Sequence, residues 1–292
     1  MKKINVGIIG TGNIGCDLLV KIQKSKYLNC SLFMGRNINS KGMKFANNMG
    51  INIKDKSIDA LIETPSICDV VFDATTAASH IKHAKILKEL GKYTIDLTPS
   101  LIGKMCIPVI NGRQCLNEDN ISMITCGGQA TVPIACALTK CYTNIKYIEI
   151  VASIASKSAG VGTRDNIDEF TQTTKKALIT FSKCNDAKAL IVINPAEPPI
   201  IMNNTIYAMI DNPDLDLLTK EIKNVEFEIQ KYVPGYRIKL GPIYKDGIVT
   251  IMIQVIGIGD YLAPYAGNLD IITSAAINMA ERYAKKLLRE IK

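Results

Sequence analysis

Residues 5–15 read NVGIIGTGNIG, a short apolar run that leads into three glycines spaced as GxGxxG. This pattern predicts a buried strand, a tight turn, and a helix that begins at about Gly15. The first glycine allows the turn, Gly12 lets the backbone approach a pyrophosphate, and the third lets helix and strand pack closely. The helix N-terminus favours the phosphate charge. The stretch therefore predicts a dinucleotide site, and a glycine-rich turn without a ligand is the alternative.

The residues around this motif alternate between strand and helix patterns as far as about residue 125. Helices are expected over residues 15–24, 41–49 and 77–90, and strands over residues 5–9, 29–34, 70–73 and 93–96, with 121–125 closing this half. Alternating short apolar strands and helices predict a parallel sheet with right-handed crossovers.

From about residue 145 the strands become longer and richer in β-branched residues. Strands are expected over residues 145–155, 189–194, 205–210 and 248–258, and helices over 166–182, 214–233 and 269–292. This pattern predicts an α+β domain with a mixed sheet, one face of which is covered by helices.

Composition excludes several classes of protein. The net charge is +8, but the lysines are scattered, which favours a solvated surface over a nucleic-acid interface. The apolar runs are short of a membrane span, and the N-terminal run is too short for a signal peptide. We therefore expect a cytoplasmic protein. Nine cysteines without a CxxC pair, together with only two histidines, predict no metal site.

One of the nine cysteines differs from the rest in its surroundings. Residues 124–133 read ITCGGQATVP, in which Cys126 follows an apolar strand and precedes two glycines and a run that looks helical from Thr131 onward. Free N–H groups at a helix N-terminus lower the pKa of a thiol and hold an oxyanion formed by attack on a carbonyl. The sequence therefore predicts Cys126 as a nucleophile, whereas the other eight cysteines look structural.

Three further groups leave alternatives open. The stretch after the second strand, GRNINSK over residues 35–41, lacks the acid that favours NAD, so Arg36, with donors from Ser40 and Lys41, either binds the 2′-phosphate of NADP or lies in an exposed basic loop. The loop SKSAGVGTR, residues 156–164, either presents donors to a phosphate or is structural. His80 and His83 either share a metal or form a pair on a helix surface, and the surface pair is favoured.

Six motifs, GTGNIG, TCGGQATVP, SKSAGVGTR with NIDEF, INPAEPP, YVPGYR and PYAGNLDIITSAA, occur in an order that resembles the CoA-dependent acylating acetaldehyde dehydrogenases. These enzymes are the partners of 4-hydroxy-2-oxovalerate aldolase. The resemblance covers nearly the whole chain. It implies a Rossmann dinucleotide-binding domain, residues 1–127 with 268–292, and a glyceraldehyde-phosphate-dehydrogenase-like catalytic and dimerisation domain, residues 128–267.

The resemblance also implies a reaction and a set of site residues. A short aldehyde, CoA and NAD or NADP would give acyl-CoA and the reduced cofactor, reversibly, through a thioester on Cys126 in a homodimer. The cofactor-binding residues implied by the motifs are Gly10, Thr11, Gly12, Asn13, Ile14, Gly15, Arg36, Ser158, Ala159, Gly160, Val161, Gly162, Thr163, Arg164, Asp165, Asn166 and Asn268.

The sequence departs from the family at three places. The acid after the second strand is absent, Asn204 stands where the family has an aspartate proposed to activate the thiol, and the connection between residues 237 and 265 is short. An amide cannot act as a base. The identity of the aldehyde and the aldolase partnership therefore stay open. Two other functions also stay open: reduction of a different acyl thioester, carrier-bound or free, and nucleotide binding by a non-catalytic regulator.

Overall fold

The computed structural model describes residues 2–143 and 145–290. Its contacts divide the chain into two compact units, Met1–Met123 with Thr273–Lys292, and Ile124–Ile272. The functional boundaries expected at residues 127 and 268 stay a prediction. Within the described ranges, no helix is long and apolar enough to cross a membrane.

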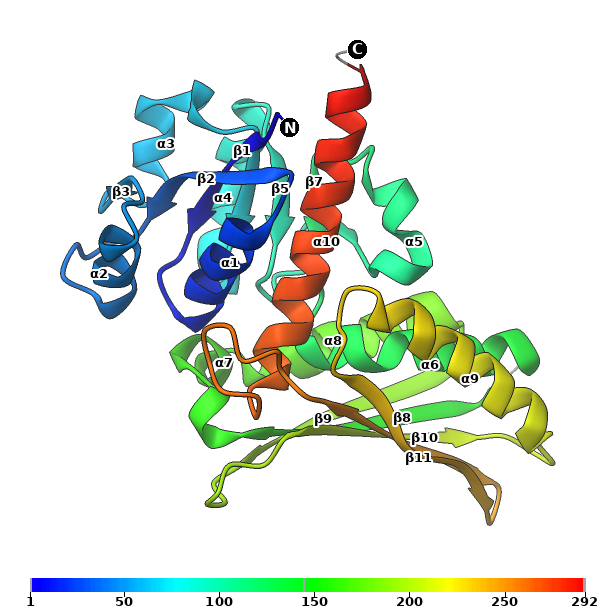
Figure 1. Cartoon of the computed structure of the whole chain (residues 1–292). Coiled ribbons are helices and arrows are strands. Elements are labelled where there is room, and N and C mark those ends of the chain that lie inside the picture. The colour runs from blue at the N-terminus through cyan, green and yellow to red at the C-terminus, as the bar shows by residue number, and fades with distance from the viewer. Residues whose placement is uncertain (1, 144, 291–292) are drawn as a thin grey trace. The chain divides into compact units, whose positions relative to one another are not determined.

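The first unit is built on a parallel sheet with the strand order β3-β2-β1-β4-β5-β7-β6 (Figure 1). Its strands are β1 (Ile4–Ile9), β2 (Leu28–Met34), β3 (Ile53–Lys54), β4 (Val70–Asp73), β5 (Tyr93–Asp96), β6 (Lys104–Met105) and β7 (Asn120–Ser122). Its helices include α1 (Asn13–Lys24), α2 (Lys41–Asn48), α3 (Asp59–Glu63), α4 (Ala77–Glu89) and α5 (Pro108–Cys115). The predicted parallel sheet is confirmed.

The last helix, α10 (Gly267–Glu290), supplies its residues from Thr273 onward to this first unit. Buried Asp17 of α1 accepts hydrogen bonds from Thr273 Oγ1 at 2.5 Å and from Lys21 Nζ at 2.6 Å. Farther along α10, the ring of Tyr283 stacks on Tyr93 with ring centres 3.9 Å apart. The chain therefore ends in the unit in which it begins, as the resemblance implies.

The second unit contains a five-stranded sheet with the order β11-β12-β10-β8-β9. Its strands are β8 (Tyr147–Ala155), β9 (Asp186–Asn194), β10 (Met202–Met209), β11 (Tyr236–Lys245) and β12 (Ile248–Val255). Only β8 and β9 run parallel, so the predicted mixed sheet is confirmed. Helices α6 (Cys126–Cys141), α8 (Ile167–Ser182) and α9 (Leu215–Gln230) cover one face of this sheet (Figure 1).

Strand β11 is absent from the elements expected from the sequence. Gly241 and Pro242 interrupt its apolar pattern, and its register against β12 shifts twice. Because proline cannot donate to a ladder and glycine weakens a strand, the pattern reads as a loop, whereas the pairing with β12 holds it at the sheet edge.

Candidate functional site

The turn between β1 and α1 has the steric properties of a dinucleotide-binding turn. Gly10 has φ +109°, and a Cβ there would lie 2.4 Å from Ala74 O. A Cβ on Gly15 would lie 1.9 Å from Gly10 O, so neither position accepts a side chain. Around the ideal Cβ position of Gly12, by contrast, no atom of the described residues lies within 4 Å. The turn therefore leaves an open space beside its second glycine.

This space lies at a helix end whose N–H groups are not capped by a side chain. Gly12 is the N-cap residue of α1, and the structure shows no side-chain hydrogen bond to the cap. Since such N–H groups favour an anion, the turn fits the pyrophosphate of a nicotinamide dinucleotide.

The loop that carries Arg36 packs against the same turn. A Cβ on Gly42 would lie 2.0 Å from Thr11 O, so the start of α2 lies tightly against Thr11. Ser40 caps α2 by accepting a hydrogen bond from the backbone N–H of Met43, and its Oγ lies 3.4 Å from Thr11 Oγ1. Arg36 and Lys41 are exposed. The loop thus carries two exposed cations, while Ser40 caps α2.

In the second unit, Cys126 is the first residue of α6. Thr125 caps this helix, because its Oγ1 accepts a hydrogen bond from Gly128 N at 2.9 Å. The same hydroxyl donates to Thr174 Oγ1 at 2.7 Å, since Thr174 already donates to Phe170 O. The helix therefore begins at Cys126 and not at Thr131 as the sequence suggests. Gly127 and Gly128 made this segment look non-helical in the sequence, but the packing around the helix start requires them.

That packing places the start of α6 between a strand and a helix. A Cβ on Gly127 would lie 2.9 Å from the ring of Phe170 and 3.6 Å from the Cβ of Ala152 in β8. Just before the helix, Ile124 has φ +65°, a left-handed conformation that is strained for a β-branched residue. Such strain is typical of residues that aim a functional group, here the sulfur of Cys126.

The expected lowering of the Cys126 pKa is wrong. Burial raises the pKa of this thiol to about 12, although hydrogen bonds from the backbone N–H of Gly127 and of Cys126 itself lower it. Desolvation disfavours the charged thiolate more than the helix N-terminus favours it. Cys126 therefore rests as a neutral thiol, with two N–H donors directed at its sulfur.

Asn204 lies on the covered face of the same sheet. It belongs to β10, is paired in register with Ala152, and has no solvent exposure. Both polar atoms of its side chain lack a hydrogen-bond partner among the residues that the structure describes. A buried amide without hydrogen-bond partners destabilises the folded state, so its presence in a native structure calls for an explanation, such as a ligand that binds it.

The loop that follows β8 is tied together by its own side chains. Arg164 donates to Ala159 O, Ser156 O and Ser156 Oγ, and Asn166 donates to Gly162 O at 2.6 Å. Ser158 is buried and donates to Ala155 O at 2.8 Å. The guanidinium of Arg164 thus fixes the shape of the loop. Around the ideal Cβ position of Gly160, no atom of the described residues lies within 4 Å.

Asn268 lies in the first turn of α10, still within the second unit. Gly267 fixes this turn against β12, since a Cβ there would lie 1.9 Å from Val255 O. Asn268 is 5% exposed, and its Oδ1 has no partner in the part of the chain that the structure describes. A buried, unpaired acceptor suits a donor from a ligand, such as the amide of a nicotinamide ring.

The predicted residues thus fall into two groups. Residues 10–15 and Arg36 lie in the first unit, and Cys126, residues 158–166 and Asn268 lie in the second.

The interpretation of His80 and His83 as a surface pair is wrong. Both are buried, and both place Nδ1 on one carboxylate oxygen of Asp73. The spacing gave no sign of Asp73, which lies in a different element. Across the described residues, no group of three or more His, Cys, Asp or Glu side chains is arranged to hold a metal.

Comparison with known proteins identifies the family. Residues 5–115 match the family model described as semialdehyde dehydrogenase, NAD binding domain, and residues 126–263 match prokaryotic acetaldehyde dehydrogenase, dimerisation. An acetaldehyde dehydrogenase of Spirochaeta aurantia is 52% identical over 97% of this chain and 96% of its own length. The chain belongs to the acetaldehyde dehydrogenase family. Another member, from Pectobacterium atrosepticum, is 48% identical over 97% of this chain and 98% of its own.

Solved structures support the fold of the family at much lower identity. Aspartate semialdehyde dehydrogenase with NADP from Candida albicans is 13% identical, with a TM-score of 0.68 over 96% of this chain and 98% of its own. The enzyme from Vibrio cholerae is also 13% identical, with a TM-score of 0.62 over 99% of both chains. These likenesses show that the chain shares the fold of the two enzymes, and the match of residues 5–115 to the NAD binding domain model supports a nicotinamide cofactor.

Proposed function

We propose that this chain is an acylating acetaldehyde dehydrogenase, which converts acetaldehyde, CoA and NAD(P)+ to acetyl-CoA, NAD(P)H and a proton. The observation that carries the proposal is Cys126 at the first position of α6, with two backbone N–H groups directed at its sulfur, in a chain of this family. The two other functions left open by the sequence, reduction of a different acyl thioester and non-catalytic regulation, are not favoured, since the similar relatives are named acetaldehyde dehydrogenases.

The chemistry begins with loss of the Cys126 thiol proton. The thiolate attacks the aldehyde carbon, a C–S bond forms, and the carbonyl oxygen becomes an oxyanion that N–H groups at the start of α6 can stabilise. A bound nicotinamide cofactor would supply the acceptor for the hydride lost from this carbon. The thiol of CoA then displaces Cys126 from the resulting thioester, which releases acetyl-CoA and restores the sulfur.

Deprotonation is the demanding step for this site. Because the pKa of Cys126 is raised to about 12, only a small fraction is thiolate at neutral pH. Asn204 cannot take the proton, as an amide is not a base. The two N–H groups that face the sulfur therefore have to stabilise the thiolate as it forms.

We assign two groups of residues to the cofactor. Residues 10–15 supply the uncapped helix end and the open space at Gly12 for the pyrophosphate. We assign residues 158–166 and Asn268 to the nicotinamide side, and the unpaired Oδ1 of Asn268 supports this.

Exposed Arg36, without an acid near it in sequence, supports a preference for NADP. We therefore expect Arg36→Asp to lower the ratio of kcat/KM for NADP to that for NAD by about tenfold, the size of one lost charge-assisted contact. Arg113→Asp serves as a control for charge, since Arg113 is an exposed arginine in the last turn of α5. An unchanged ratio in Arg36→Asp would reject the role of this arginine.

The uncovered face of the second sheet supports a homodimer. Outward-facing residues of β9, β10, β11 and β12 form an exposed apolar surface, made of Leu190, Val192, Tyr207, Met209, Leu240, Ile243 and Ile248. A surface of this kind marks an interface, and it lies within residues 126–263, which match the dimerisation model. We expect Met209→Lys to shift the protein toward monomer in light scattering, whereas Ile81→Lys, at a 58% exposed residue of the first unit, leaves its mass unchanged.

An aldolase partner and a cytoplasmic location remain predictions from the sequence.

The decisive experiment measures NADH and NADPH formation from acetaldehyde and CoA. We expect Cys126→Ser to lose at least about a thousandfold in turnover, because serine is a far poorer nucleophile at this position. Cys136→Ser, later on the same helix, is the matched control and should keep its activity. Turnover by Cys126→Ser equal to that of the wild type would contradict the thioester route.

A further inference from the structure

The inner face of α4 holds both histidines of the sequence against one carboxylate. His80 and His83 are three residues apart and therefore share a helix face, and they are 0% and 8% exposed. His80 Nδ1 lies 2.9 Å, and His83 Nδ1 2.7 Å, from Asp73 Oδ2. An Nδ1 that faces a carboxylate oxygen carries a hydrogen, so both rings donate to Asp73.

The second oxygen of the same carboxylate binds the turn that follows β4. Asp73 Oδ1 accepts from Thr75 N at 3.1 Å and from Thr75 Oγ1 at 2.5 Å. Burial raises the pKa of Asp73, but the two histidines lower it by more, so that the pKa of this carboxyl lies well below its usual range. A fixed carboxylate with four donors therefore joins α4 to the turn.

Ala74, between Asp73 and Thr75, is the part of that turn that touches the dinucleotide turn. Its N–H donates to Ile9 O at 2.7 Å. Its carbonyl oxygen occupies the place that a Cβ on Gly10 would need, only 2.4 Å from the ideal position. The backbone of Ala74 is thus the wall against which the first glycine of the GxGxxG turn rests.

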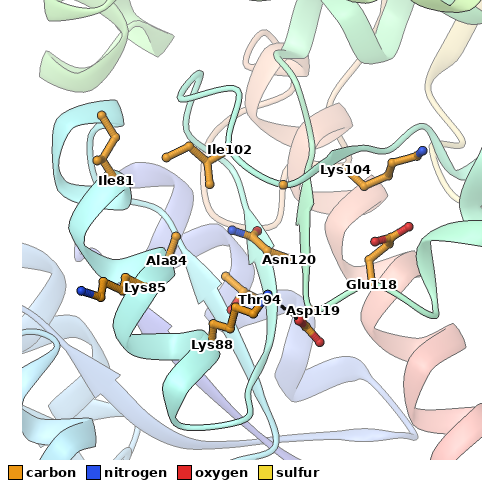
Figure 2. Close-up of a pocket in the computed structure, with 11 residues that line it drawn as sticks. Ile81, Ala84, Lys85, Lys88, Thr94, Ile102, Lys104, Glu118, Asp119 and Asn120 are labelled. Carbon is orange, nitrogen blue, oxygen red and sulfur yellow. Dashed lines mark ion pairs between the residues drawn. The ribbon is translucent and has the colours of Figure 1, made fainter.

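The same histidine connects this wall to the neighbouring strands. His80 Nε2 lies 3.0 Å from Asn120 Nδ2 of β7 and 3.5 Å from Asp96 Oδ2 of β5. Asp96 in turn accepts from Thr98 N and Ser100 Oγ, both at 2.7 Å. Asn120 also lines a cavity of about 650 Å³ together with Thr94 and three lysines (Figure 2). His80 therefore ties the wall to β5 and β7 as well as to α4.

We propose that Asp73, His80 and His83 are positioning residues for the dinucleotide. They act through Ala74: by fixing its backbone against Gly10 they hold the pyrophosphate-binding turn in its binding geometry. This inference rests on the proposed function in one respect, that the ligand of the turn is a nicotinamide dinucleotide. The affinity for the cofactor then depends in part on these three residues.

The test compares cofactor binding with stability in matched variants. The dissociation constants of NADH and NADPH are measured by fluorescence titration at 25 °C, and the melting temperature is measured on the same samples. His83→Leu removes one donor to Asp73, and we expect the dissociation constant to rise about tenfold, the equivalent of one hydrogen bond to a charged group. His83→Gln keeps a donor and should recover most of the affinity. The kcat at saturating cofactor should change by less than about twofold, because Asp73 and its partners act on binding alone.

A variant at the other end of the same strands separates positioning from stability. Tyr283→Leu breaks the stacking on Tyr93, at the start of β5, and leaves the dinucleotide turn untouched. It should lower the melting temperature without changing the dissociation constant. A rise in the dissociation constant of Tyr283→Leu equal to that of His83→Leu would overturn the inference, as would wild-type affinity in His83→Leu.

Two further results have defined meanings. Where His83→Leu does not fold, Asp73→Asn provides the same test, since an amide nitrogen cannot accept from either ring. Wild-type protein that binds neither dinucleotide contradicts the proposed function, and the inference with it. Tight wild-type binding with unchanged variants contradicts the inference alone.

Discussion

Two helices of this molecule begin at glycine-rich turns after a strand, and the two starts are built in opposite ways. At α1 the N-cap is Gly12, without a side-chain cap and with open space at its Cβ position. At α6 the N-cap is Thr125, whose hydroxyl accepts from Gly128 N, and the glycines are packed against Ile124 and Phe170.

The start of α1 is built to bind the negative charge of a ligand, whereas the start of α6 holds a side chain of the protein itself, that of Cys126. The first N–H groups of α1 have no side-chain cap among the described residues and remain available to an anion. Those of α6 are directed at the sulfur of Cys126 or at Thr125, which caps the helix, and desolvation keeps the thiol neutral. Similar local sequences thus provide a ligand site in one unit and a nucleophile in the other.

The strongest way to break the comparison is to fill the glycines of α1. Gly15→Ala places a methyl group on Gly10 O and should cost about 3 kcal/mol or more of unfolding free energy. Gly12→Val should cost only about 1 kcal/mol, because its side chain enters open space. It should weaken NADH binding about a hundredfold, since the side chain fills the approach of the phosphate. Urea unfolding and fluorescence titration measure both, and wild-type affinity in Gly12→Val would contradict the assignment of the turn.

The reactivity of Cys126 tests the buried side of the comparison. Because burial raises its pKa to about 12, the thiolate fraction should rise about tenfold per pH unit between pH 7 and pH 10. The rate of alkylation by iodoacetamide, followed at Cys126 by peptide mass spectrometry, should rise with the same slope. Cys141, the last residue of the same helix, provides the internal comparison. A plateau at Cys126 below pH 9 would show a thiol activated in the free protein.

Local sequence rules predicted the start of α1. For the start of α6 they predicted the helix N-terminus but not the direction of the pKa shift of Cys126. The GxGxxG spacing is enough for α1, since its contacts, Gly15 on Gly10 and Gly10 on Ala74, belong to the strand–turn–helix unit and its neighbouring strand. For Cys126 the sequence indicated the helix N-terminus, but the sign of the pKa shift depends on burial, which comes from the strands and helices packed around it. His80 and His83 show the same limit, because their partner Asp73 belongs to another element.

The cap of α6 should carry a smaller effect. Thr125→Val removes the acceptor for Gly128 N, and we expect a loss of about 1–2 kcal/mol in unfolding free energy. Thr125→Ser keeps the acceptor and should lose less. Thr139→Val, on the same helix and away from its start, should change stability by under about 0.5 kcal/mol. Equal losses in Thr125→Val and Thr139→Val would mean that the hydroxyl of Thr125 does not fix the position of Cys126.

The smallest effect in stability should have the opposite sign. Asn204 holds two buried polar atoms without partners among the described residues, so Asn204→Leu should raise the free energy of unfolding by about 1 kcal/mol. Asn203→Leu, on the other face of the same strand, removes a hydrogen bond to Ile201 O and should bring no such gain. If the amide is kept to bind a group that reaches the site at Cys126, turnover of acetaldehyde in Asn204→Leu should fall while its stability rises. A stability lower than that of the wild type would contradict the unpaired state of this amide. Leucine has a similar volume, and its introduction removes no hydrogen bond if the amide makes none.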